Sequence, residues 1–295
     1  LRHQEFVAET SKTNPQAAWE YIKKNFVKDG EVVGNAHELA HMVGNAAYRK
    51  FGIEGMNVCD DAFAFGCYHG VTEQALQEYG LEAVQKIEQD CLGIFPAESS
   101  GKYASCIHGI GHGLLVWEKL RISKALEDCD ALAVPHRSFC YDGVFMEYSL
   151  VAVEESFGQE DPWKFCLGFP GQYHYSCGEY HVFAMRRVSE WNFDKLAASC
   201  FGAPTQALKE SCERSLGHIA AQDVKGDGEQ IMRVCGAIVR LEGESACLMY
   251  ASEEIIFQEY KGWRESSETL CNELPTDWKE RCLENNEKTV QIYNR

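Results

Sequence analysis

The sequence predicts an all-α protein, an array of about eight antiparallel helical hairpins cross-linked by disulfides within each repeat. Three observations predict this fold. Its 14 cysteines fall into seven consecutive couples, the second members of these couples recur every 34 to 39 residues, and no stretch alternates like a half-buried strand. A period near 35 residues with helical patterning is typical of stacked helix pairs. We therefore expect one repeat domain over residues 1–295, either an α/α solenoid or a closed toroid.

The cysteine couples are predicted to be disulfides. Their members lie 8 to 15 positions apart, and none has the two-residue spacer of a zinc knuckle. Each first cysteine falls near the end of one expected helix and each second near the start of the next, points that face each other in an antiparallel hairpin. The predicted pairs are Cys59–Cys67, Cys91–Cys106, Cys129–Cys140, Cys166–Cys177, Cys200–Cys212, Cys235–Cys247 and Cys271–Cys282.

The first hairpin, about 14–52, has no cysteine. Its first helix is expected from Pro15 to about Asp29, with Asn14 as its cap, and its second from about 31 to 51, ending before Gly52. Seven cross-linked hairpins follow over about 53–295. Their second helices are expected at 67–79, 102–120, 136–153, 173–190, 204–223, 242–260 and 276–293. The first helix near Cys59 is short, and the others are expected at 81–91, 121–131, 161–167, 192–201, 227–238 and 263–273.

Composition and charge restrict the environment and the partners. The formal net charge is −17, and an anionic surface repels nucleic acid and acidic lipid. No apolar stretch approaches the 18 or so residues of a membrane span, so we expect no membrane insertion. The first residues do not resemble a signal peptide, which indicates a mature or trimmed form. Seven disulfides would place the chain outside the cytoplasm, as a secreted, periplasmic or cell-surface protein.

Histidines recur in the same register as the cysteines. Two and six residues after the second cysteine of a couple stand His69 and Glu73 in one hairpin, and His108 and His112 in the next. The cysteine-free hairpin fits this register with Asn35 in the cysteine position. Residues i and i+4 share one helix face, so the side chains of three neighbouring helices should meet. The predicted metal ligands are His37, His41, His69, His108 and His112, with Glu73 as a sixth.

Glycines stand beside these histidines, as in His69-Gly70, His108-Gly109 and Asp142-Gly143. Glycine inside a helix costs about 1 kcal/mol relative to alanine, and is tolerated where helices approach closely. The first pair also matches H-E-x-x-H, through His37, Glu38 and His41, in which the glutamate of a zinc metallopeptidase is the general base. Glu38 and Glu73 are therefore the candidate catalytic residues.

The same register supplies weaker candidates further along the chain. Asp142 and His218 occupy ligand positions in later repeats, and His181 lies four residues after Cys177. Each is a secondary candidate for the metal site. Nearby carboxylates either extend the polar wall or belong to an acidic surface; they are Glu147, Glu179, Glu253 and Glu254.

Three functions remain open from the sequence. The first is a zinc-type hydrolase acting on a small-molecule or peptide substrate, because zinc with an open coordination position activates water. The second is a copper-dependent redox protein that uses the same histidines. The third is a non-enzymatic repeat scaffold that binds a protein or peptide, and repeat ends could also self-assemble. The layout resembles disulfide-linked tetratricopeptide-type and Sel1-type repeats in design alone, because their small-residue pattern is not evident.

Overall fold

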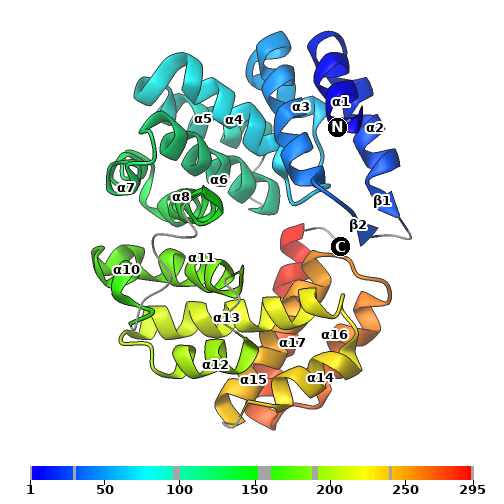
Figure 1. Cartoon of the computed structure of the whole chain (residues 1–295), viewed down its shortest axis with the longest axis vertical. Coiled ribbons are helices and arrows are strands. Elements are labelled where there is room, and N and C mark those ends of the chain that lie inside the picture. The colour runs from blue at the N-terminus through cyan, green and yellow to red at the C-terminus, as the bar shows by residue number, and fades with distance from the viewer. Residues whose placement is uncertain are drawn as a thin grey trace. The chain divides into compact units, whose positions relative to one another are not determined.

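Helices make up nearly all of the computed structural model, which describes residues 2–28, 31–95, 100–151, 161–187, 192–238 and 241–293 (Figure 1). The chain divides into two compact units, Leu1–Tyr148 and Ser149–Arg295. The all-α class predicted from the sequence is confirmed. The array of about eight hairpins, its closure and the single domain stay predictions.

The first unit contains the histidine-rich repeats. Its elements, in chain order, are α1 (Arg2–Thr13), α2 (Pro15–Asn25), β1 (Val27–Lys28), β2 (Glu31–Val32), α3 (Ala36–Phe51), η1 (Gly52–Val58), α4 (Gly66–Tyr79), η2 (Gly80–Ala83), α5 (Val84–Ile94), α6 (Ser100–Trp117), α7 (Ile122–Cys129), η3 (Val134–His136) and α8 (Arg137–Val151). Trp19, Ile22 and Leu39 are almost fully buried and fix α2 against α3.

The second unit continues the alternation of shorter and longer helices. Its elements are α10 (Lys164–Leu167), η4 (Gly171–Tyr173), α11 (His174–Arg187), α12 (Phe193–Phe201), α13 (Gln206–Asp223), α14 (Gly228–Gly236), α15 (Leu241–Phe257), α16 (Trp263–Asn272) and α17 (Thr276–Tyr293). The expected helix limits at 29, 153 and 190 lie outside the described residues.

The first hairpin differs from its sequence-based description at two places. The helix expected from about 31 begins at Ala36, because Glu31–Val32 pairs antiparallel with Val27–Lys28 in a short hairpin. Valines favour extended backbone, and Gly34 at φ 69° is in the left-handed region, so a helix cannot pass through it. Helix α1 was not predicted; the Phe6 ring packs on Tyr21 of α2, with their centroids 4.2 Å apart.

Seven disulfides join consecutive cysteines, couple by couple, and the chain has no free cysteine. The bridged Cα atoms lie 5.3 to 6.0 Å apart, within the normal range. From Cys91–Cys106 onward, each bridge ties a residue in or near a shorter helix to the longer helix that follows. The seven disulfides fit an oxidising, extracellular environment. Among the described helices, none is both long and apolar enough to cross a membrane.

Glycines allow α3, α4, α6 and α8 of the first unit to pack backbone to backbone (Figure 1). A Cβ atom added to Gly70 of α4 would overlap the carbonyl oxygen of His41 on α3. A Cβ added to Gly143 of α8 would likewise overlap the carbonyl oxygen of His108 on α6. Since these obstacles are backbone atoms, no side-chain rotation could make room. The glycines beside the histidines therefore set the helix spacing at the level of the histidine rings.

We predict that Gly70→Ala forces α3 and α4 apart and lowers the free energy of unfolding by about 1–3 kcal/mol, as overpacking does. Urea unfolding followed by circular dichroism measures the change. Gly93→Ala in α5 is the matched control, because an added Cβ there meets nothing within 4 Å. Since alanine is the better helix former, this control should be neutral or stabilising by up to about 1 kcal/mol. Equal losses in both variants would contradict the close-approach role.

Candidate metal centre

Five histidines from three helices form one cluster in the first unit. Helix α3 provides His37 and His41, α4 provides His69, and α6 provides His108 and His112. Neighbouring ring centroids lie 4.8 to 5.6 Å apart, and every ring has at least two neighbours within this range. The repeat register therefore brings together the five histidines that the sequence singles out.

Three members of the cluster could bind a metal ion. One ring nitrogen from each of His37, His41 and His69 lies within 4.8 Å of the other two. Among the described residues, no other group of three or more His, Cys, Asp or Glu side chains brings its ligand atoms together in this way. His69 is 3% exposed, and the other two side chains are partly buried, so any ion they hold would be largely shielded from water.

Outer hydrogen bonds fix the orientation of three of the rings. The Nδ1 atom of His37 donates to the carbonyl oxygen of Phe63 at 2.7 Å. The Nδ1 atom of His41 faces Oε2 of Glu73 at 3.4 Å, and the Nδ1 atom of His112 donates to Glu147 at 2.8 Å. An acceptor on Nδ1 leaves the lone pair on Nε2, which is how metal-binding histidines are usually oriented.

The Phe63 carbonyl is presented by an unusual backbone turn. Phe63, Ala64 and Phe65 have φ values of 55°, 49° and 61°, in the left-handed region that non-glycine residues rarely adopt. Such a conformation costs roughly 1–2 kcal/mol per residue. The turn lies between Cys59 and Cys67, which are joined by a disulfide. Strained backbone of this kind is concentrated at functional sites, and here it supplies the acceptor for a candidate ligand.

The Nε2 atoms of His37 and His41 face each other at 3.1 Å. The Nδ1 bond of His37 leaves its lone pair on Nε2, so the contact is a hydrogen bond if the proton of His41 is on Nε2. If His41 instead donates from Nδ1 to Glu73, both Nε2 lone pairs face each other and can share a cation. Two nitrogens bound tetrahedrally to zinc at about 2.0–2.1 Å lie roughly 3.3 Å apart. The observed spacing is close to that value, so the residues fit a metal ion of this size.

Burial favours the neutral form of His37, His69, His108 and His112. Desolvation, followed by repulsion from His41, lowers the pKa of His37 to about 4. Desolvation and the neighbouring imidazoles also lower the pKa values of His69, His108 and His112 well below the usual value. Metal ligation requires neutral imidazole, and at pH 7 these rings need not lose a proton before they bind.

The carboxylates expected at the site occupy different environments. Glu73 lies at the cluster through its contact with His41. Glu38 is exposed and accepts a hydrogen bond from the amide of Asn35 at 3.2 Å, so the structure does not bring it together with the imidazoles. One residue after His37 the helix has turned by about 100°, which directs Glu38 to solvent. Its role as general base stays a prediction.

Helix α8 adds two groups to the edge of the cluster. The Sδ atom of Met146 lies 3.3 Å from Nε2 of His108. Glu147 lies against His112, and burial raises the pKa of its carboxyl group. Asp142, the secondary candidate on this helix, is half-buried one turn before Met146. The sequence predicts no specific role for Glu147. The one signal it offers is that Glu147 directly follows Met146, which occupies a register position.

The register positions of the second unit hold a partly buried ion network. Arg214 of α13 contacts Glu179 of α11 at 3.3 Å and Glu253 of α15 at 2.6 Å. Burial opposes the ionisation of Glu253, but Arg214 lowers its pKa to about 2. Burial raises the pKa of Glu254 to about 7.

The other two secondary candidates, His181 and His218, both belong to this second unit. His181 stacks on Phe165 and donates from Nε2 to the carbonyl oxygen of Pro162. The Nδ1 atom of His218 lies 3.8 Å from Glu254. Burial lowers the pKa of each to about 4, so both are neutral at pH 7.

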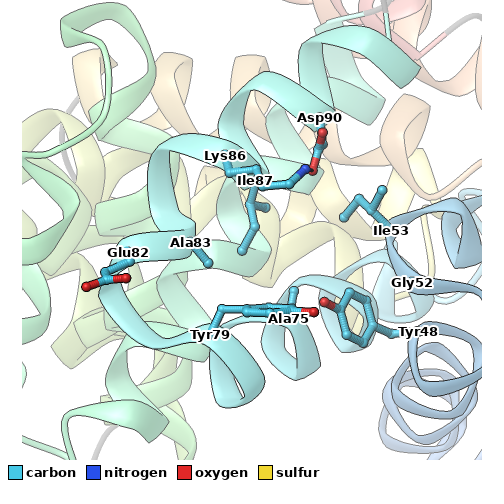
Figure 2. Close-up of a pocket in the computed structure, with 10 residues that line it drawn as sticks. All are labelled: Tyr48, Gly52, Ile53, Ala75, Tyr79, Glu82, Ala83, Lys86, Ile87 and Asp90. Carbon is cyan, nitrogen blue, oxygen red and sulfur yellow. Dashed lines mark hydrogen bonds and ion pairs between the residues drawn. The ribbon is translucent and has the colours of Figure 1, made fainter.

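A pocket of about 490 Å³ lies on the same two helices as the first three ligands (Figure 2). Tyr48 from the end of α3 and Tyr79 from the end of α4 line one side, and Lys86 and Asp90 of α5 form an ion pair on the other. Tyr48 follows His41 by seven residues, about 10 Å along the helix. The pocket therefore has aromatic side chains on one side and an ion pair on the other, and it lies in the unit that carries the histidines.

No protein-family model, curated protein sequence or solved structure matches this chain.

We predict that Glu254 weakens the second unit as the pH rises. Its folded pKa of about 7 exceeds the unfolded value of about 4.3, so its contribution to stability is complete below pH 4 and is lost as the pH rises through 7. The slope approaches about 1.4 kcal/mol per pH unit within this window. Glu254→Gln retains an oxygen to accept the amide hydrogen bonds of Gln222 and Gln258, and should remove this slope.

Urea unfolding of both proteins at pH 5, 6, 7 and 8 measures the difference in slope. The exposed Glu280→Gln in α17 is the control and should keep the wild-type dependence. His218 lies 3.8 Å from Glu254 and titrates in the opposite sense below its ordinary pKa of 6.5, so the slopes are compared between pH 7 and 8, where this ring is largely neutral. Parallel curves for wild type and Glu254→Gln would show that Glu254 ionises normally.

Proposed function

We propose that this chain is an extracytoplasmic, metal-dependent hydrolase of the zinc type. The observation that carries the proposal is the 3.1 Å approach of two Nε2 atoms, on His37 and His41, whose Nδ1 atoms are both committed to acceptors. With His41 donating from Nδ1, the two Nε2 lone pairs face each other, and a bound cation makes that arrangement favourable. His69 completes a three-nitrogen set, and catalytic zinc sites use three protein ligands with one position left open.

Zinc held in this way would lower the pKa of a bound water to about 7 and polarise a substrate carbonyl. The chain's own residues would orient the ligands and accept the proton. Phe63 and Glu73 hold the rings of His37 and His41 through their Nδ1 atoms. Glu73 contacts His41, and the sequence predicts it as a candidate base. Its carboxylate could accept a proton from water in the centre.

The pocket at the ends of α3 and α4, in the unit that carries the cluster, supports a small-molecule or peptide substrate. Its two tyrosines offer apolar and aromatic contact, and the Lys86–Asp90 pair offers polar groups to an amide or carboxylate. Ligand pockets commonly combine an apolar lining with a few such groups. The net charge of −17 disfavours nucleic acid as a substrate. Secretion and self-assembly through the repeat ends are further parts of this proposal.

We predict that zinc stabilises the first unit and that His41→Ala, which removes one ligand of the first triad, reduces this effect. Zinc at one hundred times its dissociation constant should add about 2.7 kcal/mol to the free energy of unfolding, and a chelator should remove it. Thermal unfolding with zinc or with EDTA measures the difference, in protein purified without a histidine tag. His3→Ala is the control, because His3 is exposed and contacts Tyr21 outside the cluster. No response to either reagent in wild type would end the proposal.

Glu73→Gln should retain zinc but lose hydrolysis by 100-fold or more, the contribution typical of a general base. Turnover of p-nitrophenyl acetate and of a mixed peptide library measures activity, and elemental analysis measures zinc. Glu38→Gln, at the exposed position of the H-E-x-x-H pattern, is the comparison. Loss of activity only in Glu38→Gln would move the role of base to that residue.

A copper-dependent redox function is the second candidate, and Met146 is the observation that favours it. A thioether is a soft ligand that selects copper(I) over zinc, and its sulfur lies 3.3 Å from a cluster nitrogen. We predict that Met146→Leu weakens copper(I) binding by at least tenfold and leaves zinc binding unchanged. Competition with a chromogenic copper(I) chelator measures the affinity. Unchanged copper(I) affinity would remove the specific support for this function.

A further inference from the structure

We propose that the cluster binds two metal ions, one in each of two histidine triads that share His69. The first triad is His37, His41 and His69, with ring centroids 4.8, 5.4 and 5.6 Å apart. The second is His69, His108 and His112, with centroids 4.9, 4.9 and 5.0 Å apart. By ring centroids the second triangle is at least as tight as the first and nearly equilateral, although among the described residues one nitrogen from each ring converges within 4.8 Å only in the first triad. This proposal rests on metal binding at the first triad.

Two buried nitrogens in the second triad lack a partner among the described residues. His112 is 1% exposed; its Nδ1 donates to Glu147, and its Nε2 makes no hydrogen bond. His69 is 3% exposed, and its Nδ1 likewise makes none. A buried polar atom left unpaired costs about 1–3 kcal/mol. Two such atoms in one triangle of imidazoles point to a cation as the missing partner.

One ion would not use all five rings. A tetrahedral ion binds three imidazoles when one coordination position is left open, and four when all positions are filled. At least one of the five histidines would therefore remain without a metal ion. Two ions, each in one triad, would employ every ring. His69 can serve both because imidazole has two nitrogens, one for each ion. It would then release its remaining N–H proton to solvent as the second ion binds.

The two triads are constructed in the same way. Gly70 lets α4 approach α3 at His41, and a Cβ added to Gly109 would lie 2.9 Å from the Cα atom of His69, so that glycine lets α6 approach α4. Each triad also has its own carboxylate, since Glu73 faces His41 and Glu147 faces His112. These carboxylates help to balance the charge of two divalent ions and orient one ligand of each triad.

The test is the number of ions bound by the full chain. Wild type, His41→Ala and His112→Ala are loaded with zinc, dialysed, and analysed for zinc per chain, and cobalt titrations followed by absorbance give the same count independently. We expect two ions in wild type and one in each variant, with two in the control His136→Ala, whose ring pairs with Glu88 outside the cluster. Circular dichroism checks that each variant is folded.

One ion in wild type would overturn the proposal and leave the proposed function standing. No ion in wild type would overturn both. Two ions in His112→Ala would also contradict the second triad, because its Nε2 would then be dispensable. The wild-type count decides the main question without any variant, so a variant that fails to fold does not remove the test.

Discussion

The close backbone approach of four helices is the constraint on which the candidate centre depends. The ring nitrogens of His37, His41 and His69 lie within 4.8 Å of one another although they come from two helices. Glycine at positions 70, 109 and 143 removes the side chain that would hold these helices apart. Each glycine lowers the stability of its helix relative to alanine. Because glycines nevertheless recur beside the histidines, we infer that close approach of the rings, and not helix stability, accounts for glycine at these positions.

The two units use the same register for different chemistry. In the first, the register positions carry neutral imidazoles, kept uncharged by burial. In the second, Arg214 places a permanent cation between Glu179 and Glu253. A buried guanidinium with two carboxylate partners satisfies a polar interior without any added ion, whereas a cluster of neutral imidazoles does not. Among the described residues, the candidate metal site therefore belongs to the first unit.

The sequence was sufficient for the helical class, the cysteine couples and the five histidines, because all three repeat with a period that can be counted. It was less informative wherever the structure departs from that period. Helix α1 and the short hairpin before α3 precede the first cysteine and have no register to follow. Glu147 lies one residue past a register position, so its contact with His112 depends on the exact rotation of α8. The Phe63 acceptor is a backbone atom and has no side-chain signature.

The strained turn at Phe63 also makes the candidate centre depend on disulfide formation. Three left-handed residues in succession are held inside the loop that Cys59 and Cys67 close. Before that bond forms, nothing covalent holds the turn, and relaxation of its backbone would withdraw the carbonyl that orients His37. The first disulfide is therefore the covalent constraint on the acceptor of His37, and in a chain kept reduced this ring of the candidate centre would lose that constraint.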